Sequence, residues 1–429
     1  MDERNDELNR RRQERQKERA IYASQMKMLK WGMIAMLAVL LICGVAILIA
    51  FVAARQPTPQ AAAPSSGTQA PTVTTVPPET QPVTPDTVIH FLAGGDLNVT
   101  KKVVESGVTT SGYDYTEVFK DVMPLLAGAD LSAINLEGNI YDTEYGDKKS
   151  AAPEQLMESL RNAGVDLVQM ANSMTLKNGT LGLDSTLDSI RANGMEPVGA
   201  FASEEEYEKS GGYFLREING IKIAVVAFTK GGTKIPKGYD YCVNLLYKDY
   251  YNDYQKVDTE GINAVLKRIR AQKPDVTIAL LHWGSEYNNI ISPTQEKICQ
   301  LMQKGGVDAI IGTHPHYVQK IDYQADKGSV VAYSLGDFLG NAEDKRTRYS
   351  VMLDLEITKN GETGEVKITN ATPIPLYILD ETESGGGLTV LRMREAIAAY
   401  ENQLINRVPD AVYESMKESL ALIEKQIKG

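Results

Sequence analysis

Hydrophobic residues are unevenly distributed along the 429-residue chain, and their spacing divides it into distinct segments. The run from Trp31 to Ala54 holds 24 residues without a charge. The next segment, Gln56 to Asp86, contains eight prolines in 31 residues. From Thr87 onward, short apolar runs alternate with stretches whose apolar residues recur at helical spacing. The pattern therefore predicts an apolar span, a proline-rich stalk and a folded region.

The folded region alternates between predicted strands and predicted helices. The predicted strands, each ending in a polar loop, are TVIHFLAGGD, LSAINLEGN, VDLVQMAN, IKIAVVAFT, DVTIALLHWG, DAIIGTHPH and SVVAYSLGDF. The predicted helices between them include APEQLMESLRNAG, STLDSIRANG and SPTQEKICQLMQKGG, and each ends near a glycine, as helices often do. Strands that alternate with helices indicate an α/β fold in which helices cover a sheet.

The C-terminal part of the chain has a different pattern. Residues 349–378 alternate apolar and polar positions with period two around a glycine turn, which predicts an antiparallel hairpin. The tail from Leu388 to Lys428 is interpreted as two helices separated near RVPDA. We therefore place the main domain at residues 87–380 and C-terminal helices at residues 381–429.

The apolar run 31–54 predicts a transmembrane helix. At 1.5 Å per residue, 24 residues form about 36 Å of helix, which exceeds a hydrocarbon core of about 30 Å. Residues 1–30 hold nine Lys and Arg and residues 56–100 hold none, so the basic segment 1–30 is expected in the cytoplasm. A cleaved signal peptide is the alternative, although its apolar region is usually about 7–15 residues long.

This topology predicts a single-pass protein of the cell membrane. The lipid bilayer holds residues 31–54, the stalk 55–86 extends outward, and the folded region is extracellular. A buried helix of a soluble core rarely has so long an uncharged run.

Charge and cysteine content exclude some classes of protein. Subtracting the ten basic and six acidic residues of positions 1–55 from totals of 45 and 56 leaves 35 and 50, a net charge of −15 for residues 56–429. Such a surface repels nucleic acid and other polyanions unless it has a local basic patch.

The chain has three cysteines, and Cys43 falls in the predicted span. The other two cysteines, Cys242 and Cys299, do not form a disulfide framework and are expected to be free buried thiols.

Candidate metal ligands follow the predicted strands. Ligands of α/β sheets gather at the carboxyl ends of the strands, so side chains at these ends can converge. Three of the four histidines in the chain stand at two such positions, whereas His90 lies within a strand and is not expected in a site. Together, nitrogen and carboxylate donors suit Mn, Fe or Zn better than Ca or Mg. The candidate ligands are Asp96, Glu137, Asn172, His282, His314 and His316.

Five motifs resemble those of the bacterial CapA-type family, which is linked to capsule and poly-γ-glutamate synthesis. They are GGD, NLEGN, HWGSEY, GTHPHYVQ and YSLGDF, and the resemblance spans Thr87 to Ile378. The family is similar to calcineurin-like metallophosphoesterases, which implies a four-layer α/β/β/α sandwich with a site for one or two divalent metal ions.

The resemblance also implies roles for individual residues. Asp96 matches the first ligand carboxylate, Glu137 the acidic residue that bridges two metals, and the three candidate histidines the histidine ligands. Trp283 and Glu286 complete the HWGSEY motif, in which Trp283 is read as packing and Glu286 as a catalytic or His-orienting carboxylate.

The segment after VDLVQMA departs from the family pattern. Asn172 is kept as a catalytic or ligand residue, but Ser173, Met174 and Lys177 stand where the family has Asn, His and Asp. Methionine cannot transfer a proton, so general acid catalysis of the family type is lost there. Lysine for aspartate disfavours a nearby cation, unless Lys177 faces solvent. Asp337 also replaces the asparagine of the family's YSLGNF motif.

Three functions fit this sequence. The first is an extracellular metal-dependent hydrolase of metallophosphoesterase type, acting on poly-γ-glutamate or another anionic envelope polymer. The second is a membrane-anchored accessory protein with a partly degenerate site, which binds the polymer or a membrane synthase complex without turnover. The third is a purely structural stalk and head.

Overall fold

The computed structural model describes residues 84–404 and 408–429. All of them belong to one compact unit, Gln81–Gly429. The predicted cytoplasmic segment, transmembrane span and most of the stalk, with Cys43, lie outside the described residues. Within the described part of the chain, no helix combines the length and apolar character needed to span a membrane.

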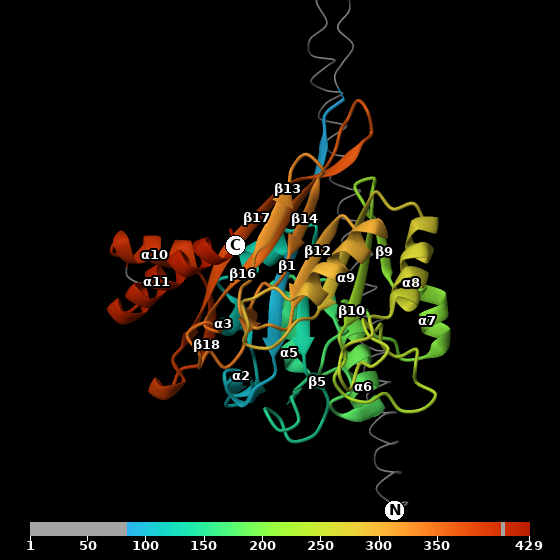
Figure 1. The fold of residues 1–429 in the computed structure, drawn as a ribbon. Helices are drawn as coiled ribbons and strands as arrows, with labels where there is room; N and C mark the ends of the chain where they lie inside the picture. The colour runs from blue at the N-terminus through green and yellow to red at the C-terminus, as the bar shows by residue number, and fades with distance from the viewer. Residues whose placement is uncertain (1–83, 405–407) are drawn as a thin grey trace, which may run out of the picture. The chain divides into compact units, whose positions relative to one another are not determined.

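The first of two large sheets has eight strands and mixed direction (Figure 1). Its order is β18-β17-β16-β1-β4-β7-β8, and β15 pairs with the end of β1. Strands β1, β4, β7 and β8 are parallel, whereas β16, β17 and β18 continue the sheet with antiparallel pairing. The strands are β1 (Thr87–Asn98), β4 (Leu131–Glu137), β7 (Leu167–Gln169), β8 (Glu196–Val198), β15 (Asp337–Leu339), β16 (Tyr349–Lys359), β17 (Val366–Asp380) and β18 (Leu388–Arg392).

The second sheet has six strands in the order β13-β14-β12-β11-β10-β9. Its centre is parallel, and β9 and β13 add antiparallel edges. The strands are β9 (Phe214–Ile218), β10 (Ile221–Thr229), β11 (Val276–His282), β12 (Ala309–Thr313), β13 (Ile321–Gln324) and β14 (Ser329–Ala332). Two small ribbons pair β2 (Val108–Thr109) with β3 (Gly112–Tyr113) and β5 (Asn139–Ile140) with β6 (Ala151–Ala152).

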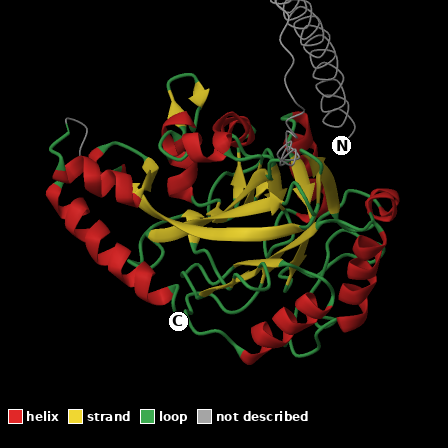
Figure 2. Cartoon of the chain, turned by 90° about the horizontal axis from the view of Figure 1, so that it is seen from above, coloured by secondary structure: helices red, strands yellow, loops and turns green. Residues whose placement is uncertain are grey.

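Helices lie on the outer sides of the two sheets (Figure 2). They are α2 (Lys101–Glu105), α3 (Thr116–Phe119), α4 (Met123–Gly128), α5 (Gln155–Ala163), α6 (Gly179–Ala192), α7 (Glu204–Ser210), α8 (Thr259–Ala271), α9 (Pro293–Lys304), α10 (Met393–Glu401) and α11 (Asp410–Gln426), with a 3-10 turn at Thr382–Ser384. Helix α9 begins with a capping box between Ser292 and Gln295, which satisfies backbone N–H groups at its first turn.

The alternation of side chains along β10 explains the layers. Val226 and Phe228 pack in one core with α8 and α9. Their neighbours Val225 and Ala227 face the opposite way and join the core shared with the first sheet. Helices α10 and α11 contact β16 and β17 on the other side of the molecule. The order of layers is therefore helix, sheet, sheet, helix, as the predicted α/β/β/α sandwich requires.

The structure confirms the seven predicted strands and the 349–378 hairpin, which forms β16 and β17. The tail was predicted less well. Helices α10 and α11 are present, but residues 388–392 form β18, because their backbone pairs with β17 at the sheet edge. The domain boundaries proposed from the sequence stay predictions.

Candidate metal centre

The carboxyl ends of strands from both sheets meet at one place. In the first sheet, Asn98 at the end of β1 stands beside Glu137 at the end of β4. In the second sheet, Thr229, His282 and Thr313 lie in register at the ends of β10, β11 and β12. Parallel pairing thus brings residues that are far apart in sequence to a common edge, as predicted for the candidate ligands.

Two glycines bring the β1 and β15 backbones together. A Cβ atom on Gly95 would lie 1.8 Å from the carbonyl oxygen of Gly336, so no side chain fits there. The next residue, Asp96, donates its backbone N–H to the same carbonyl at 3.0 Å, and Asp96 pairs with Asp337 in the strand register. The glycines of GGD and SLGD are therefore required to place two carboxylates side by side.

Among the described residues, seven form a continuous row of possible metal ligands. Within each of three groups, one ligand atom per residue lies within 4.8 Å of the others. His314 is shared by the first two groups and His316 by the last two, so the donors could serve more than one ion. The groups are Glu137, His282 and His314; Glu286, His314 and His316; and Asp96, His316 and Asp337.

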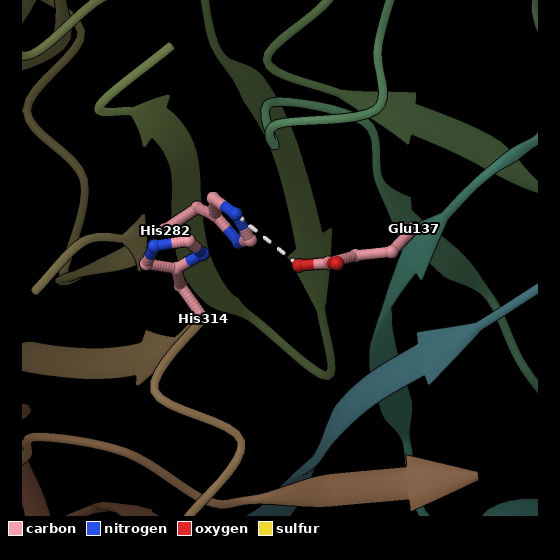
Figure 3. Close-up of side chains that lie close together, drawn as sticks. All are labelled: Glu137, His282 and His314. Carbon is pink, nitrogen blue, oxygen red and sulfur yellow. Dashed lines mark ion pairs between the residues drawn. The ribbon is translucent and has the colours of Figure 1, made fainter. Parts of the chain in front are cut away.

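The first group is buried, and three of its polar atoms make no hydrogen bond. Figure 3 shows Glu137 reaching from the first sheet toward His282, which stands beside His314. Glu137 Oε1 and His282 Nε2 are 3.2 Å apart, yet neither makes a hydrogen bond, nor does His314 Nδ1. The other ring nitrogen of His282, Nδ1, lies 3.2 Å from Thr313 Oγ1, which leaves Nε2 to face Glu137.

Burial controls the ionisation of this first group. It raises the pKa of Glu137 well above the usual range, and the nearby Asp96 carboxylate adds to the effect. Burial also lowers the pKa of His282 and His314 well below 6.5. Without a cation, burial thus favours the uncharged form of all three side chains.

The group of Asp96, His316 and Asp337 is different, because its members satisfy one another. His316 Nδ1 lies 2.8 Å from Asp337 Oδ1 and 3.6 Å from Asp96 Oδ2. Burial opposes protonation of His316, but Asp337 and the other carboxylates hold its pKa well above 6.5. Burial raises the pKa of Asp96 to about 6. The carboxylates beside His316 thus stabilise its charged form.

The backbone at the two loop histidines is strained. His314 has φ of 92° and His316 has φ of 59°, in the region that non-glycine residues rarely adopt. The backbone N–H of His314 donates to Asp96 Oδ2 at 2.9 Å. A loop fixed in this conformation directs both imidazoles toward the carboxylates, and strain of this kind is typical of functional sites.

Asn172 lies beside the cluster, where its amide forms structural hydrogen bonds. Its Nδ2 donates to Asn135 Oδ1 at 3.0 Å and to the Leu136 carbonyl at 2.7 Å, and its Oδ1 accepts from the Met174 backbone N–H at 2.9 Å. Asn135 in turn donates to Asp96 Oδ1 at 2.6 Å. The predicted ligand and catalytic roles of Asn172 stay predictions; in this structure it holds the loop and, through Asn135, the Asp96 carboxylate.

An open cleft of about 460 Å³ leads to the cluster. Its lining residues come from loops that follow strands of both sheets: Ser173, Met174, Lys177, Lys230, Gly231, Gly232, Thr233, Tyr254, Ser285, Glu286 and His314. Glu286 is exposed on the wall, within reach of His314 and His316. Met174 and Lys177 also lie on the wall, so the three substituted positions of this segment are part of the site.

The remaining residues considered from the sequence lie outside the cluster. Trp283 is fully buried, stacks on Tyr333 and donates its Nε1–H to the Tyr333 carbonyl, which confirms its packing role. His90 lies within β1 and contacts Asp354 on the sheet. Cys242 and Cys299 are free and buried, as predicted. Sequence reasoning missed Asn135 and Lys230 and read Asp337 as a departure. For Lys230, which directly follows β10, the strand-end position was the available signal.

The residues fit a divalent cation. Of seven buried side-chain polar atoms that lack a partner among the described residues, four belong to the site: Glu137 Oε1, His282 Nε2, His314 Nδ1 and Ser173 Oγ. Buried polar atoms without partners are costly, and a shared cation would satisfy the first three. Imidazole and carboxylate donors suit Mn, Fe or Zn.

Comparison with known proteins identifies the family. Residues 90–342, more than half of the chain, match the family described as bacterial capsule synthesis protein PGA_cap. The chain belongs to this family. It is 27% identical to the PGA biosynthesis protein CapA of Bacillus subtilis strain 168 over 301 residues, which cover 68% of this chain and 74% of the relative. It is 26% identical to the capsule biosynthesis protein CapA of Bacillus anthracis over 283 residues, 62% of this chain and 63% of the relative. The CapA-type resemblance is thus confirmed.

Solved structures show more distant similarity. One is a novel phosphatase from Mycoplasma pneumoniae, with 17% identity and a TM-score of 0.41, covering 67% of this chain and 94% of the phosphatase. Another is a hypothetical protein from Thermus thermophilus, with 13% identity and a TM-score of 0.41, covering 67% of this chain and 98% of that protein.

Proposed function

We propose that this protein acts in capsule biosynthesis, as its family does. In this proposal, its folded domain uses a divalent metal centre of metallophosphoesterase type. The substrate is poly-γ-glutamate or a similar anionic envelope polymer. The observation that carries the proposal is the first ligand group. Glu137, His282 and His314 come from two sheets and present three buried polar atoms without partners. Such an arrangement is costly unless a cation completes it.

Each residue has a defined part in this proposal. Glu137, His282 and His314 would hold one ion, and His316 with Asp96 and Asp337 forms the adjacent group that could hold a second. A bound Mn, Zn or Fe ion would supply Lewis acidity and lower the pKa of a coordinated water. Glu286, on the cleft wall beside the histidines, is placed to accept or donate a proton there.

A second candidate function is favoured by Met174. This side chain lies on the cleft wall where a proton donor is needed for hydrolysis of the family type, and a thioether cannot donate a proton. In this alternative, the domain holds a metal ion and binds the polymer or a membrane synthase complex without turnover. The arrangement of ligands is the same in both cases.

The proposed location follows from the sequence outside the described residues. The uncharged run 31–54 and the basic segment before it support a membrane-anchored protein whose folded domain is extracellular. Capsule polymers lie outside the cell, so such an anchor would hold the cleft where the polymer emerges. Protease treatment of intact cells tests this placement, because an extracellular domain is removed and a cytoplasmic one is protected.

The function itself is tested by metal content and polymer length. Full-length protein, purified without chelators, should contain bound Mn, Zn or Fe, and Glu137→Gln should lose most of it, whereas Asp354→Asn on the sheet should not. Poly-γ-glutamate incubated with the metal-loaded protein should change in length if the protein is an enzyme. Metal without a change in length supports the accessory function, and a wild-type protein that takes up no metal contradicts both.

A further inference from the structure

The cleft beside the metal cluster carries positive charge in a strongly acidic protein. Residues 56–429 have a net charge of −15, yet the charged side chains of the cleft wall are two lysines, Lys177 and Lys230, and one acid, Glu286. The approach to the cluster is thus locally basic.

Lys230 is held in place by its surroundings. Its Nζ donates to the Gly284 carbonyl at 2.9 Å and lies 4.5 Å from the centre of the Tyr254 ring. Burial lowers its pKa, while Glu286 opposes this effect. One N–H of the ammonium is used by the carbonyl, and two remain for a ligand. A partly buried, oriented ammonium interacts with an anion more strongly than a freely solvated one.

Lys177 faces the cleft from the loop after β7. Its side chain is exposed, and within the described part of the chain no hydrogen bond or ion pair engages its ammonium. Lys177, which stands where the family has aspartate, therefore adds a positive charge without an ion-pair partner to the cleft wall. It does not pair with Glu286 or with the ligand carboxylates.

The two loops that carry these lysines are packed tightly together. A Cβ atom on Gly232 would lie 2.3 Å from the Ser173 carbonyl oxygen, so a side chain at this position would separate the loops. The backbone N–H groups of Gly232 and Thr233 donate to no other residue in the described ranges. Glycine thus permits a close contact that keeps Lys177 and Lys230 on one wall, with two free amide donors beside them.

We propose that Lys177 and Lys230 form a subsite that binds carboxylate groups of an anionic polymer chain and holds the chain beside the metal cluster. This inference rests on the proposed function and names the residues that recognise the substrate. Lys230 contributes the stronger contact, because it is partly buried and oriented, and Lys177 the weaker one, because it is exposed and screened. A regularly spaced polycarboxylate can engage both ammonium groups along one chain.

The test measures binding of a fluorescent γ-linked oligoglutamate to the full-length, metal-loaded protein. A γ-linked oligomer with amidated side groups serves as the uncharged ligand, and inorganic phosphate as a competitor. We expect Lys230→Met to weaken oligoglutamate binding by about tenfold to a hundredfold, as for other hydrogen bonds to charged groups. Lys177→Met should weaken it by about two- to fivefold, as for exposed ion pairs. The amidated oligomer should bind weakly to all variants.

Matched variants separate charge from structure. Lys234→Met, on the same loop but outside the cleft lining, should bind the oligomer as wild type does. Lys230→Arg keeps the charge and should retain much of the affinity. Metal content and thermal unfolding of each variant show that the fold is intact.

The outcomes distinguish this inference from the proposed function. If wild type binds the oligomer and Lys177→Met and Lys230→Met bind it equally well, the subsite is wrong while the polymer function stands. If wild type binds no oligoglutamate, the polymer function fails, and the subsite with it. If phosphate binds in a lysine-dependent way and oligoglutamate does not, the subsite belongs to a phosphate group, and the carboxylate assignment is overturned.

Discussion

The two ends of the ligand row contain similar residues in different electrostatic states. At one end, Glu137, His282 and His314 are buried with polar atoms that have no partners. At the other end, His316 is paired with Asp337 at 2.8 Å and lies near Asp96. The first end leaves three buried polar atoms without a hydrogen bond, whereas the second end pairs its groups with one another. We therefore predict that the first end binds metal more strongly, and that the second end binds it only after His316 gives up a proton.

The difference arises from which strands supply the residues. The first end spans the two sheets, with Glu137 on β4 and His282 on β11, so no backbone pairing forces its side chains to bond to each other. The second end lies where β1 and β15 pair directly, with Asp96 opposite Asp337. The close contact between Gly95 and Gly336 then supplies two adjacent carboxylates, and the loop histidine turns toward them.

The largest expected effect is loss of a ligand at the first end. His282→Ala removes a buried imidazole from the first group and should weaken Mn or Zn binding by more than about a hundredfold, since even indirect contacts change affinity ten- to a hundredfold. Isothermal calorimetry on full-length protein measures this. His90→Ala is the matched control, because His90 contacts Asp354 on the sheet and not the cluster. Equal losses in both variants would contradict the assigned site.

A smaller effect is expected at the second end. Asp337→Asn removes the carboxylate that hydrogen bonds to His316 Nδ1, which should lower the pKa of His316 and weaken binding of a second ion by about tenfold to a hundredfold. The control is Asp354→Asn, which alters a similar carboxylate–histidine pair at His90. NMR titration of His316 and stoichiometry by calorimetry separate the two ends. An unchanged His316 pKa would show that Asp337 does not control this group.

The pH dependence of metal binding follows from the same pKa directions. Burial raises the pKa of Glu137, and raises that of Asp96 to about 6, while the carboxylates raise that of His316. A metal ion must displace each of these protons, so affinity should increase as pH rises from about 5 to 7, by about tenfold per pH unit for each proton released. Calorimetry in buffers of different ionisation enthalpy counts the protons. Affinity that is independent of pH in this range would contradict these assignments.

The smallest effect is expected from the cleft wall. Lys177→Met removes an exposed positive charge near the cluster, and because exposed charges are screened, metal affinity should rise by less than about threefold. A much larger increase would mean that Lys177 lies against the ions and competes with them, as the sequence alone allowed. Metal titration of this variant beside wild type decides between the two.

The sequence predicted the site residues that follow the carboxyl ends of predicted strands. Asp96, Glu137, His282 and His314 each follow an apolar run, and they meet where the strand ends of the two sheets come together. Asp337 was not recognised as part of the row, because β15 has three residues and its pairing with β1 leaves no periodic pattern. Lys230 was missed because a single lysine after a strand is usually solvated. The β18 segment was read as helix because its edge pairing with β17 is a long-range contact.

The most direct test of the metal centre is X-ray absorption at the zinc edge of full-length protein loaded with one equivalent of zinc. We expect nitrogen and oxygen ligands at about 2.0–2.2 Å, with the scattering pattern of imidazole. That pattern should weaken in a His282→Ala and His314→Ala double variant and persist in His90→Ala. A spectrum without imidazole scattering, or one that the double variant leaves unchanged, would contradict a metal centre at Glu137, His282 and His314.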